Sequence, residues 1–237
     1  MKPEIKIFQN TEEIANYLGT YLTELSQRKN EVFIALSGGN TPKTIFKTLS
    51  HQYQNKIDWS NLRFFWGDER CVPPTHRESN FGMTREHLFD FVPVSGDYIF
   101  RIKGELSAEQ ASTDYRNCIL ENVPLDKNIP QFDLILLGMG DDGHTASIFP
   151  HQINLWDSAN ICETATHPDT GQQRVTLTGN VINNAKQIIF LITGSNKSEK
   201  IKEILNEAPV SKNYPAALAD KAKSLWLLDD KAANLIK

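Results

Sequence analysis

The chain alternates short, almost uninterrupted apolar runs with longer segments in which apolar residues recur every three or four positions. A run of five or six apolar residues is typical of a strand buried on both faces, as in parallel sheets. The longer spacing is typical of helices that pack one face on a core. The pattern predicts buried strands at 32–36, 62–66, 134–138, 187–192 and 224–228, and a shorter strand at 5–8.

Helix ends are marked by polar residues before the periodic segments. Asn10 with Glu13, and Asn196 with Glu199, have the spacing of capping pairs that satisfy the first backbone N–H groups of a helix. We expect helices over 11–29, from 41 to about 49, from 79 or 80 to 89, from 107 to about 122, from 180, from 196, over 215–220 and in the C-terminal tail.

This alternation of strands and helices predicts one α/β domain over residues 1–237, a three-layer Rossmann-like domain with a mainly parallel sheet. Residues 174–178 have the pattern of a further short strand. The segment 151–172 has little secondary-structure signal, and we expect it to be irregular and able to lie over a site as a lid.

Composition narrows the possible partners. A net charge of −4 gives no overall basic field, so we expect no binding to nucleic acid or to a membrane. Cys71, Cys118 and Cys162 are widely spaced, which fits a reducing cytosol and argues against disulfides or a zinc site. We find no apolar run typical of a signal peptide or a membrane span, and we therefore expect a cytoplasmic protein.

A glycine turn follows the strand at 32–36, with the sequence Ser37-Gly-Gly-Asn-Thr-Pro-Lys43. Thr41 before Pro42 is a favourable helix start, with a hydroxyl cap and proline at the first helical position. A strand, a glycine turn and a helix N-terminus together bind phosphate well, although neither a Walker loop nor a dinucleotide fingerprint is present. The candidate anion-binding residues are Gly38, Gly39, Asn40 and Thr41.

Charged residues collect after two other strands. The segment 67–74 contains Asp68 and Arg70, which indicate a site loop or, alternatively, an exposed turn. The strand at 134–138 leads into a glycine-rich turn with Asp142 and His144. The alternative interpretation of this turn is a helix start capped by Asp142 or Thr145, with His144 merely exposed.

Two cations complete the set. Arg174 begins its short strand, and Lys197 lies in the first turn of its helix, where a positive charge opposes the helix dipole and favours a bound anion. Because parallel strands bring their carboxyl ends to one edge of a sheet, these groups can converge on one crevice. The combination suits a small phosphorylated substrate with acid–base chemistry at its other end.

The motifs that carry these residues resemble those of the 6-phosphogluconolactonase family, a branch of the group that also includes glucosamine-6-phosphate deaminases. In deaminases a catalytic glutamate precedes the proline of the third motif, whereas Phe149 stands here, and tyrosine follows Asp-Glu, whereas Arg70 stands here. Asp141 stands where serine is common. The five motifs cover residues 37–42, 66–73, 138–150, 174–178 and 193–197.

The resemblance implies hydrolysis of 6-phospho-D-glucono-1,5-lactone to 6-phospho-D-gluconate, in the oxidative pentose phosphate pathway, without a metal or another cofactor. We expect His144 to activate water, Asp142 to orient its imidazole, and Arg70 to face the oxyanion or the sugar hydroxyls. Asp68 is expected among the substrate-binding residues or, alternatively, to bond loop backbone N–H groups. The phosphate is expected to contact Gly38, Gly39, Asn40, Thr41, Arg174 and Lys197.

Other readings remain open from the sequence. Phe149 and Arg70 disfavour a sugar-phosphate isomerase or deaminase on the same scaffold, and Asp142, His144 and Arg70 disfavour a sugar-phosphate sensor without catalysis. A metal-dependent hydrolase lacks a plausible cluster of ligands in the sequence. We expect a monomer or a weak dimer. The remaining histidines are expected at the surface, namely His51, His76, His87, His151 and His167.

Overall fold

A six-stranded parallel sheet forms the centre of the computed structural model, which describes residues 2–237. The strand order is β1-β11-β10-β7-β2-β3. From β2 the sheet extends to β3 on one side and through β7, β10 and β11 on the other, and the first strand, β1, pairs with the last, β11, at the edge. The predicted strands are confirmed to within one or two residues. Their bounds are β1 Glu4–Phe8, β2 Val32–Leu36, β3 Leu62–Trp66, β7 Leu134–Leu137, β10 Gln187–Ile192 and β11 Ser224–Asp229.

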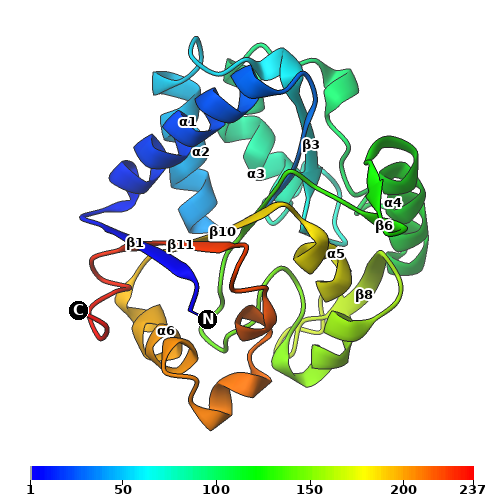
Figure 1. The fold of residues 1–237 in the computed structure, drawn as a ribbon. Coiled ribbons are helices and arrows are strands. Elements are labelled where there is room, and N and C mark those ends of the chain that lie inside the picture. The colour runs from blue at the N-terminus through cyan, green and yellow to red at the C-terminus, as the bar shows by residue number, and fades with distance from the viewer. Residues whose placement is uncertain (1) are drawn as a thin grey trace.

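Helices cover both faces of this sheet. In Figure 1, α1 and α2 lie side by side above the sheet and α6 lies below it, which gives the three-layer α/β architecture expected from the sequence. The α-helices are α1 Thr11–Arg28, α2 Asn40–Gln52, α3 Asn80–His87, α4 Ala108–Asn122, α5 Gly179–Asn184 and α6 Ser198–Leu205. Short 3₁₀ turns at Trp59–Asn61, Phe89–Phe91, Gly96–Tyr98, Pro150–Asp157, Ser195–Lys197, Pro209–Asn213 and Pro215–Leu218 connect them.

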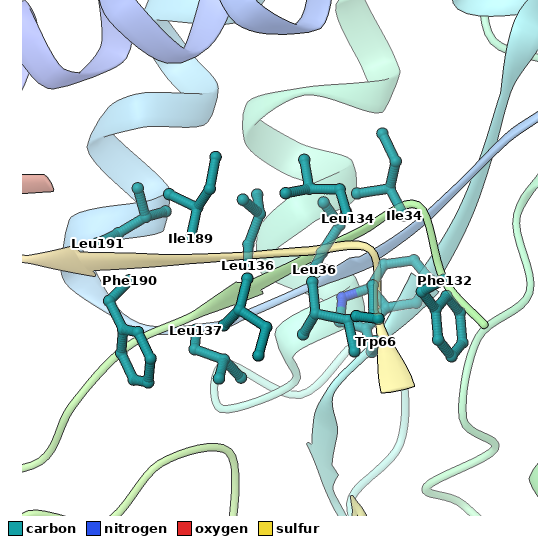
Figure 2. Packing of buried hydrophobic residues seen from close by; sticks show 14 of the residues in the cluster. Ile34, Leu36, Trp66, Phe132, Leu134, Leu136, Leu137, Ile189, Phe190 and Leu191 are labelled. Carbon is teal, nitrogen blue, oxygen red and sulfur yellow. The ribbon is translucent and has the colours of Figure 1, made fainter. Parts of the chain in front are cut away.

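The core lies on both sides of the central strands. In Figure 2, Ile189 and Leu191 point to one side of β10 and Phe190 points to the other, so neither face meets water. Every residue of β2, β7 and β11 is buried. This explains why these strands appear in the sequence as continuous apolar runs rather than as alternating patterns.

A second, antiparallel sheet stands beside the main one and was not foreseen. It consists of β4 Asp68–Arg70, β9 Gln173–Leu177 and β8 Cys162–Thr166 in the order β4-β9-β8. Arg174 therefore belongs to this sheet and not to a parallel strand. The expectation that 151–172 is irregular is wrong, since a 3₁₀ turn and β8 occupy much of it. The polar residues of β8 give no apolar run, and pairing with β9 determines its conformation.

Two helix starts confirm the sequence patterns. The Asn10 side chain accepts hydrogen bonds from the backbone N–H groups of Glu12 and Glu13 at 3.0 and 3.1 Å, and so caps α1. Ser107 caps α4 in the same way, by accepting from the Gln110 N–H group at 3.3 Å.

Other helix ends differ from expectation. Helix α2 begins at Asn40 after Gly39, whose φ of 100° is accessible mainly to glycine, so Thr41 is not the cap. Helix α6 begins at Ser198 and has no side-chain cap from Asn196. The tail after β11 forms turns rather than a helix, and Leu125–Asp126 and Ile129–Pro130 form a small unpredicted hairpin, β5 and β6. Within residues 2–237 no helix combines the length and hydropathy needed to cross a membrane.

Candidate active site

Two adjoining cavities open at the carboxyl edge of the main sheet, where the parallel strands end. The first has a volume of about 180 Å³ and the second about 360 Å³. Gly38, Gly39, Gly138 and Met139 line both, so the two cavities form a single elongated depression.

The structure brings the predicted site residues other than Asp142 together in the lining of these cavities, but it divides them between the two. The first cavity contains His144, Arg70 and Arg174, together with Asp68. The second contains Lys197. The glycine turn spans both, with Gly38 and Gly39 at the junction and Asn40 and Thr41 in the second cavity.

His144 and Asp142 form a directed pair. The Nδ1 atom of His144 lies 2.6 Å from Oδ1 of Asp142, which also accepts the backbone N–H of His144 at 3.0 Å. An ionised carboxylate only accepts, so Nδ1 carries the proton and Nε2 is the basic nitrogen. Burial raises the pKa of Asp142, but the hydrogen bonds and charge of His144 outweigh this and hold its pKa below the ordinary value.

The alternative interpretation of this turn as a helix start is wrong. Residues 144–149 form turns and an isolated bridge, and the next helical segment is the 3₁₀ turn that begins at Pro150. The Asp142 carboxylate therefore serves the imidazole instead of capping a helix. Thr145 donates its hydroxyl proton to the Gly138 carbonyl at 2.8 Å and closes the turn.

Two glycines make this turn possible. A Cβ at position 140 would lie 2.1 Å from Nδ1 of His144 and 2.7 Å from Oδ1 of Asp142. Gly143 has a φ of 86°, and a Cβ there would lie 2.6 Å from the ring of Tyr214. The glycines in the motif thus reflect the close approach of the His144–Asp142 pair and of Tyr214 to the backbone of this turn.

Phe149 forms an apolar floor beneath His144. It is fully buried, its ring centroid lies 4.7 Å from that of His144, and the Arg174 guanidinium lies 5.5 Å from its centroid. His167 packs against the same ring at 5.2 Å and is half-buried, so its assignment to the open surface is wrong. Burial first, and then the charge of Arg174, lower the pKa of His167.

Arg70 and Arg174 are cross-strand neighbours in the second sheet. They are directly opposite residues in the antiparallel pairing of β4 with β9, an arrangement that is unfavourable for like charges. Burial and the charge of Arg70 lower the pKa of Arg174, against the opposing effect of Asp68. The Nε atom of Arg70 and the hydroxyl of Ser37 are buried without a hydrogen-bond partner in residues 2–237, and both residues line the first cavity. These features favour a bound, oxygen-rich anion or dipole.

The role expected for Asp68 belongs to its neighbour. Glu69 is buried and accepts the N–H groups of Asn80 and Phe81 at 2.7 and 2.8 Å, so that it holds the first turn of α3. Burial raises the pKa of Glu69 in spite of these bonds. Asp68 instead accepts the Ser147 hydroxyl proton at 2.6 Å. The sequence showed two adjacent acids, and only the alternation of side chains along β4 separates their roles.

In the second cavity, Lys197 is already paired. Its ammonium group contacts the carboxylate of Asp141, which also accepts a hydrogen bond from the Asn196 side chain at 2.9 Å. Burial lowers the pKa of Lys197, which is consistent with a need for a nearby anion. In the same cavity, the hydroxyls of Thr41 and Thr193 lie 2.6 Å apart and join the first turn of α2 to the loop after β10.

The cysteine thiols take no part in this chemistry. Burial raises the pKa of the Cys71 thiol to about 11 and that of Cys162 further. Neither thiol is therefore ionised near neutral pH. Over residues 2–237, no three His, Cys, Asp or Glu side chains lie close enough to hold a metal ion. His87 is another departure from expectation, since its Nε2 atom is buried.

A three-layer α/β fold with a histidine–carboxylate pair beside a cationic cavity defines a sugar-phosphate enzyme class, and comparison with known proteins agrees. The model of the family "Glucosamine-6-phosphate isomerases/6-phosphogluconolactonase" matches residues 9–227, and the chain belongs to this family.

The relatives identify the branch. The chain is 43% identical to the 6-phosphogluconolactonase of Treponema pallidum over 93% of this chain and 92% of that protein. It is 42% identical to that of Haemophilus influenzae over 89% and 90%. The solved structure of the Thermotoga maritima 6-phosphogluconolactonase superposes with a TM-score of 0.84 at 30% identity. The superposition covers 97% of this chain and 100% of the Thermotoga maritima chain.

Proposed function

We propose that this enzyme hydrolyses 6-phospho-D-glucono-1,5-lactone to 6-phospho-D-gluconate. The observation that carries the proposal is the His144 imidazole, held by Asp142 through Nδ1, in a cavity that adjoins a second cavity lined by a half-buried lysine. A base at one end and a phosphate subsite at the other match the two ends of this substrate. The names of the bacterial relatives support the same reaction.

In the proposed mechanism, Nε2 of His144 removes a proton from a water molecule while the water oxygen bonds to the lactone carbonyl carbon, C1. The carbonyl electron pair moves onto its oxygen and forms a tetrahedral oxyanion. When this collapses, the bond between C1 and the ring oxygen breaks, and the imidazolium returns its proton to the ring oxygen. The products are a hydroxyl group on C5 and a carboxylic acid, which ionises. Asp142 stabilises the transient imidazolium.

The oxyanion needs hydrogen-bond donors that are in place before the reaction. We assign this role to Arg70 and Arg174, with Ser37 as a further donor. The free Nε of Arg70 and the free hydroxyl of Ser37 in residues 2–237 support this assignment, because both are buried and line the cavity of His144. Phe149 supports the imidazole from below and leaves no side chain at that position that transfers protons.

The phosphate is assigned to the second cavity, on Lys197 and the backbone of Gly39, Asn40 and Thr41. The family resemblance implies that Lys197 and Arg174 both bind the phosphate. The assignment proposed here keeps Lys197 at the phosphate and places Arg174 beside the reacting carbonyl. The reason is that Arg174 lines the cavity of His144 and Lys197 lines only its neighbour. Binding energy gained at the phosphate positions the distant carbonyl beside the base.

Hydrolysis assays on three compounds test the proposal: freshly generated 6-phosphoglucono-1,5-lactone, unphosphorylated gluconolactone and glucosamine 6-phosphate. We expect rapid turnover of the phosphorylated lactone, slow turnover of gluconolactone and no ammonia release from the amino sugar. We also expect EDTA to leave the rate unchanged, because a positioned base is sufficient for an already electrophilic ester.

Other outcomes would redirect the assignment. Ammonia release from glucosamine 6-phosphate would place the enzyme in the deaminase branch in spite of Phe149. Tight binding of 6-phosphogluconate with no turnover of any compound would favour a sensor that retains the site without catalysis.

A further inference from the structure

The ion pair between Asp141 and Lys197 stands within the subsite proposed for phosphate. The two residues come from different loops, one after β7 and the other after β10, and lie 56 positions apart in the chain. Asn196 donates a second hydrogen bond to the same Asp141 oxygen at 2.9 Å. The Asp141 carboxylate therefore already satisfies the cation that a phosphate group would use.

The two partners differ in exposure. The Lys197 side chain is only 17% exposed, whereas that of Asp141 is 66% exposed. The lysine is thus fixed at the cavity wall, while the aspartate reaches it from solvent and can return to solvent at little cost. Asp141 is exposed, so a change in its side chain requires no movement of a packed core residue.

Charge makes Asp141 and a phosphate group competitors. A phosphate ester carries about −1.5 to −2 charges at neutral pH, and a carboxylate carries about −1. Both anions prefer the same ammonium group, and they repel each other if both remain. Asp141 therefore reduces the affinity of this subsite for every phosphorylated ligand.

Resting on the function proposed above, we propose that Asp141 is an affinity-limiting residue, an internal counter-ion that a phosphate group must displace from Lys197. The cost of displacement is common to substrate, product and free inorganic phosphate. The sugar portion of the substrate adds contacts in the first cavity that inorganic phosphate does not make. Asp141 thereby lowers the affinity of the subsite for inorganic phosphate and for the phosphorylated product alike.

The experiment is isothermal titration of 6-phosphogluconate and of inorganic phosphate into the unsubstituted enzyme and into Asp141→Asn. Asparagine keeps the shape and the ability to accept a hydrogen bond but removes the charge. We expect both ligands to bind roughly three- to tenfold more tightly to Asp141→Asn. Unphosphorylated gluconate, titrated in parallel, should bind with unchanged affinity.

Asp97→Asn is the matched control, since it removes the same charge from an exposed aspartate that lines neither cavity and has no ion pair within residues 2–237. We expect it to bind both ligands as the unsubstituted enzyme does. A gain in Asp97→Asn equal to that in Asp141→Asn would reduce the effect to net charge and overturn the proposal.

A second comparison distinguishes competition between Asp141 and phosphate from positioning of Lys197 by Asp141. If Asp141 instead positions Lys197 for phosphate, Asp141→Asn will bind 6-phosphogluconate more weakly, and the proposal is overturned. In a Lys197→Met background, the effect of Asp141→Asn on affinity should shrink towards none or reverse. A phosphate subsite that binds neither ligand in the unsubstituted enzyme would refute the proposed function as well, whereas equal affinities in the two proteins would refute this inference alone.

Discussion

The two edges of the central sheet differ in how completely their buried charged and polar groups are paired. At the amino edge, the Asp133 side chain is only 5% exposed and is fully paired, with Lys29 at 2.6 Å, Lys186 at 2.9 Å and the Phe33 N–H at 3.0 Å. At the carboxyl edge, two arginines face each other and buried polar atoms of Arg70 and Ser37 lack partners in residues 2–237.

This difference distinguishes structural from functional charge. Paired charges at the amino edge tie the starts of β2, β7 and β10 together and gain nothing from a ligand. Incompletely paired charges at the carboxyl edge cost stability in the free protein, and a bound ligand supplies the missing partners. Substitutions at the carboxyl edge should therefore change activity, whereas substitutions at the amino edge should change stability.

The largest effect is expected at the base. His144→Ala should lower kcat for the phosphorylated lactone by about 10²–10⁴-fold, because it removes the group that accepts the proton from water. Steady-state hydrolysis measures this loss. Thermal unfolding should change little, and 6-phosphogluconate should bind within a few-fold of its usual affinity. Unaltered turnover would exclude His144 as the general base.

The glycine beside the base should come next. Gly140→Ala places a methyl group 2.1 Å from the imidazole Nδ1 and should displace it, lowering kcat by about 10–100-fold. Gly96→Ala is the control, since a Cβ there meets no atom within 4 Å. Equal activities of the two variants would show that the close approach at position 140 does not determine the geometry of the base.

The two cavities can be told apart by their cations. Lys197→Met should raise KM for the phosphorylated lactone by about tenfold and leave gluconolactone hydrolysis nearly unchanged, because a charge-assisted hydrogen bond to phosphate is lost. Arg174→Met should reduce kcat by about tenfold for both lactones. The ratio of kcat/KM for the two substrates measures the difference. A fall of this ratio in Arg174→Met would return Arg174 to the phosphate.

The smallest effect is expected at the amino edge and depends on pH. Burial alone would raise the pKa of Asp133, but the bonds from Lys29, Phe33 and Lys186 hold it below the ordinary value. The carboxylate therefore stabilises the fold fully above its ordinary pKa of about 3.9, and this contribution is lost as pH falls through the lowered folded value. Asp133→Asn should cost about 1–3 kcal/mol at neutral pH.

Urea unfolding at about pH 7 and about pH 3.5 tests this dependence. The stability difference between Asp133→Asn and the unsubstituted enzyme should be smaller at the acidic pH, while kcat at neutral pH stays the same. A difference that grows on acidification, or a large loss of kcat, would contradict the contrast between the edges.

The main sheet could be predicted from sequence because its strands, such as β7 and β10, are buried on both faces and leave a local apolar signal. The second sheet could not, since β4 and β8 carry mainly polar residues and depend on pairing with β9.

The same distinction applies to the candidate site, where only residues with a local sequence pattern could be predicted. His144 and Asp142 lie two positions apart and could be recognised together. The contact between Asp141 and Lys197, and the division of labour between Asp68 and Glu69, arise from tertiary structure and leave no local pattern.

Phe149 has a consequence for how chemistries diverge within this family. Its position is the one where the resemblance places a proton-transferring glutamate in the deaminases, yet here its ring contacts His144, Arg174 and His167 at once. Exchanging it for an acid removes the support of three site residues in a single step. An evolutionary path between the two reactions therefore crosses variants whose old activity is lost before the new one is supported, unless the surrounding residues change first.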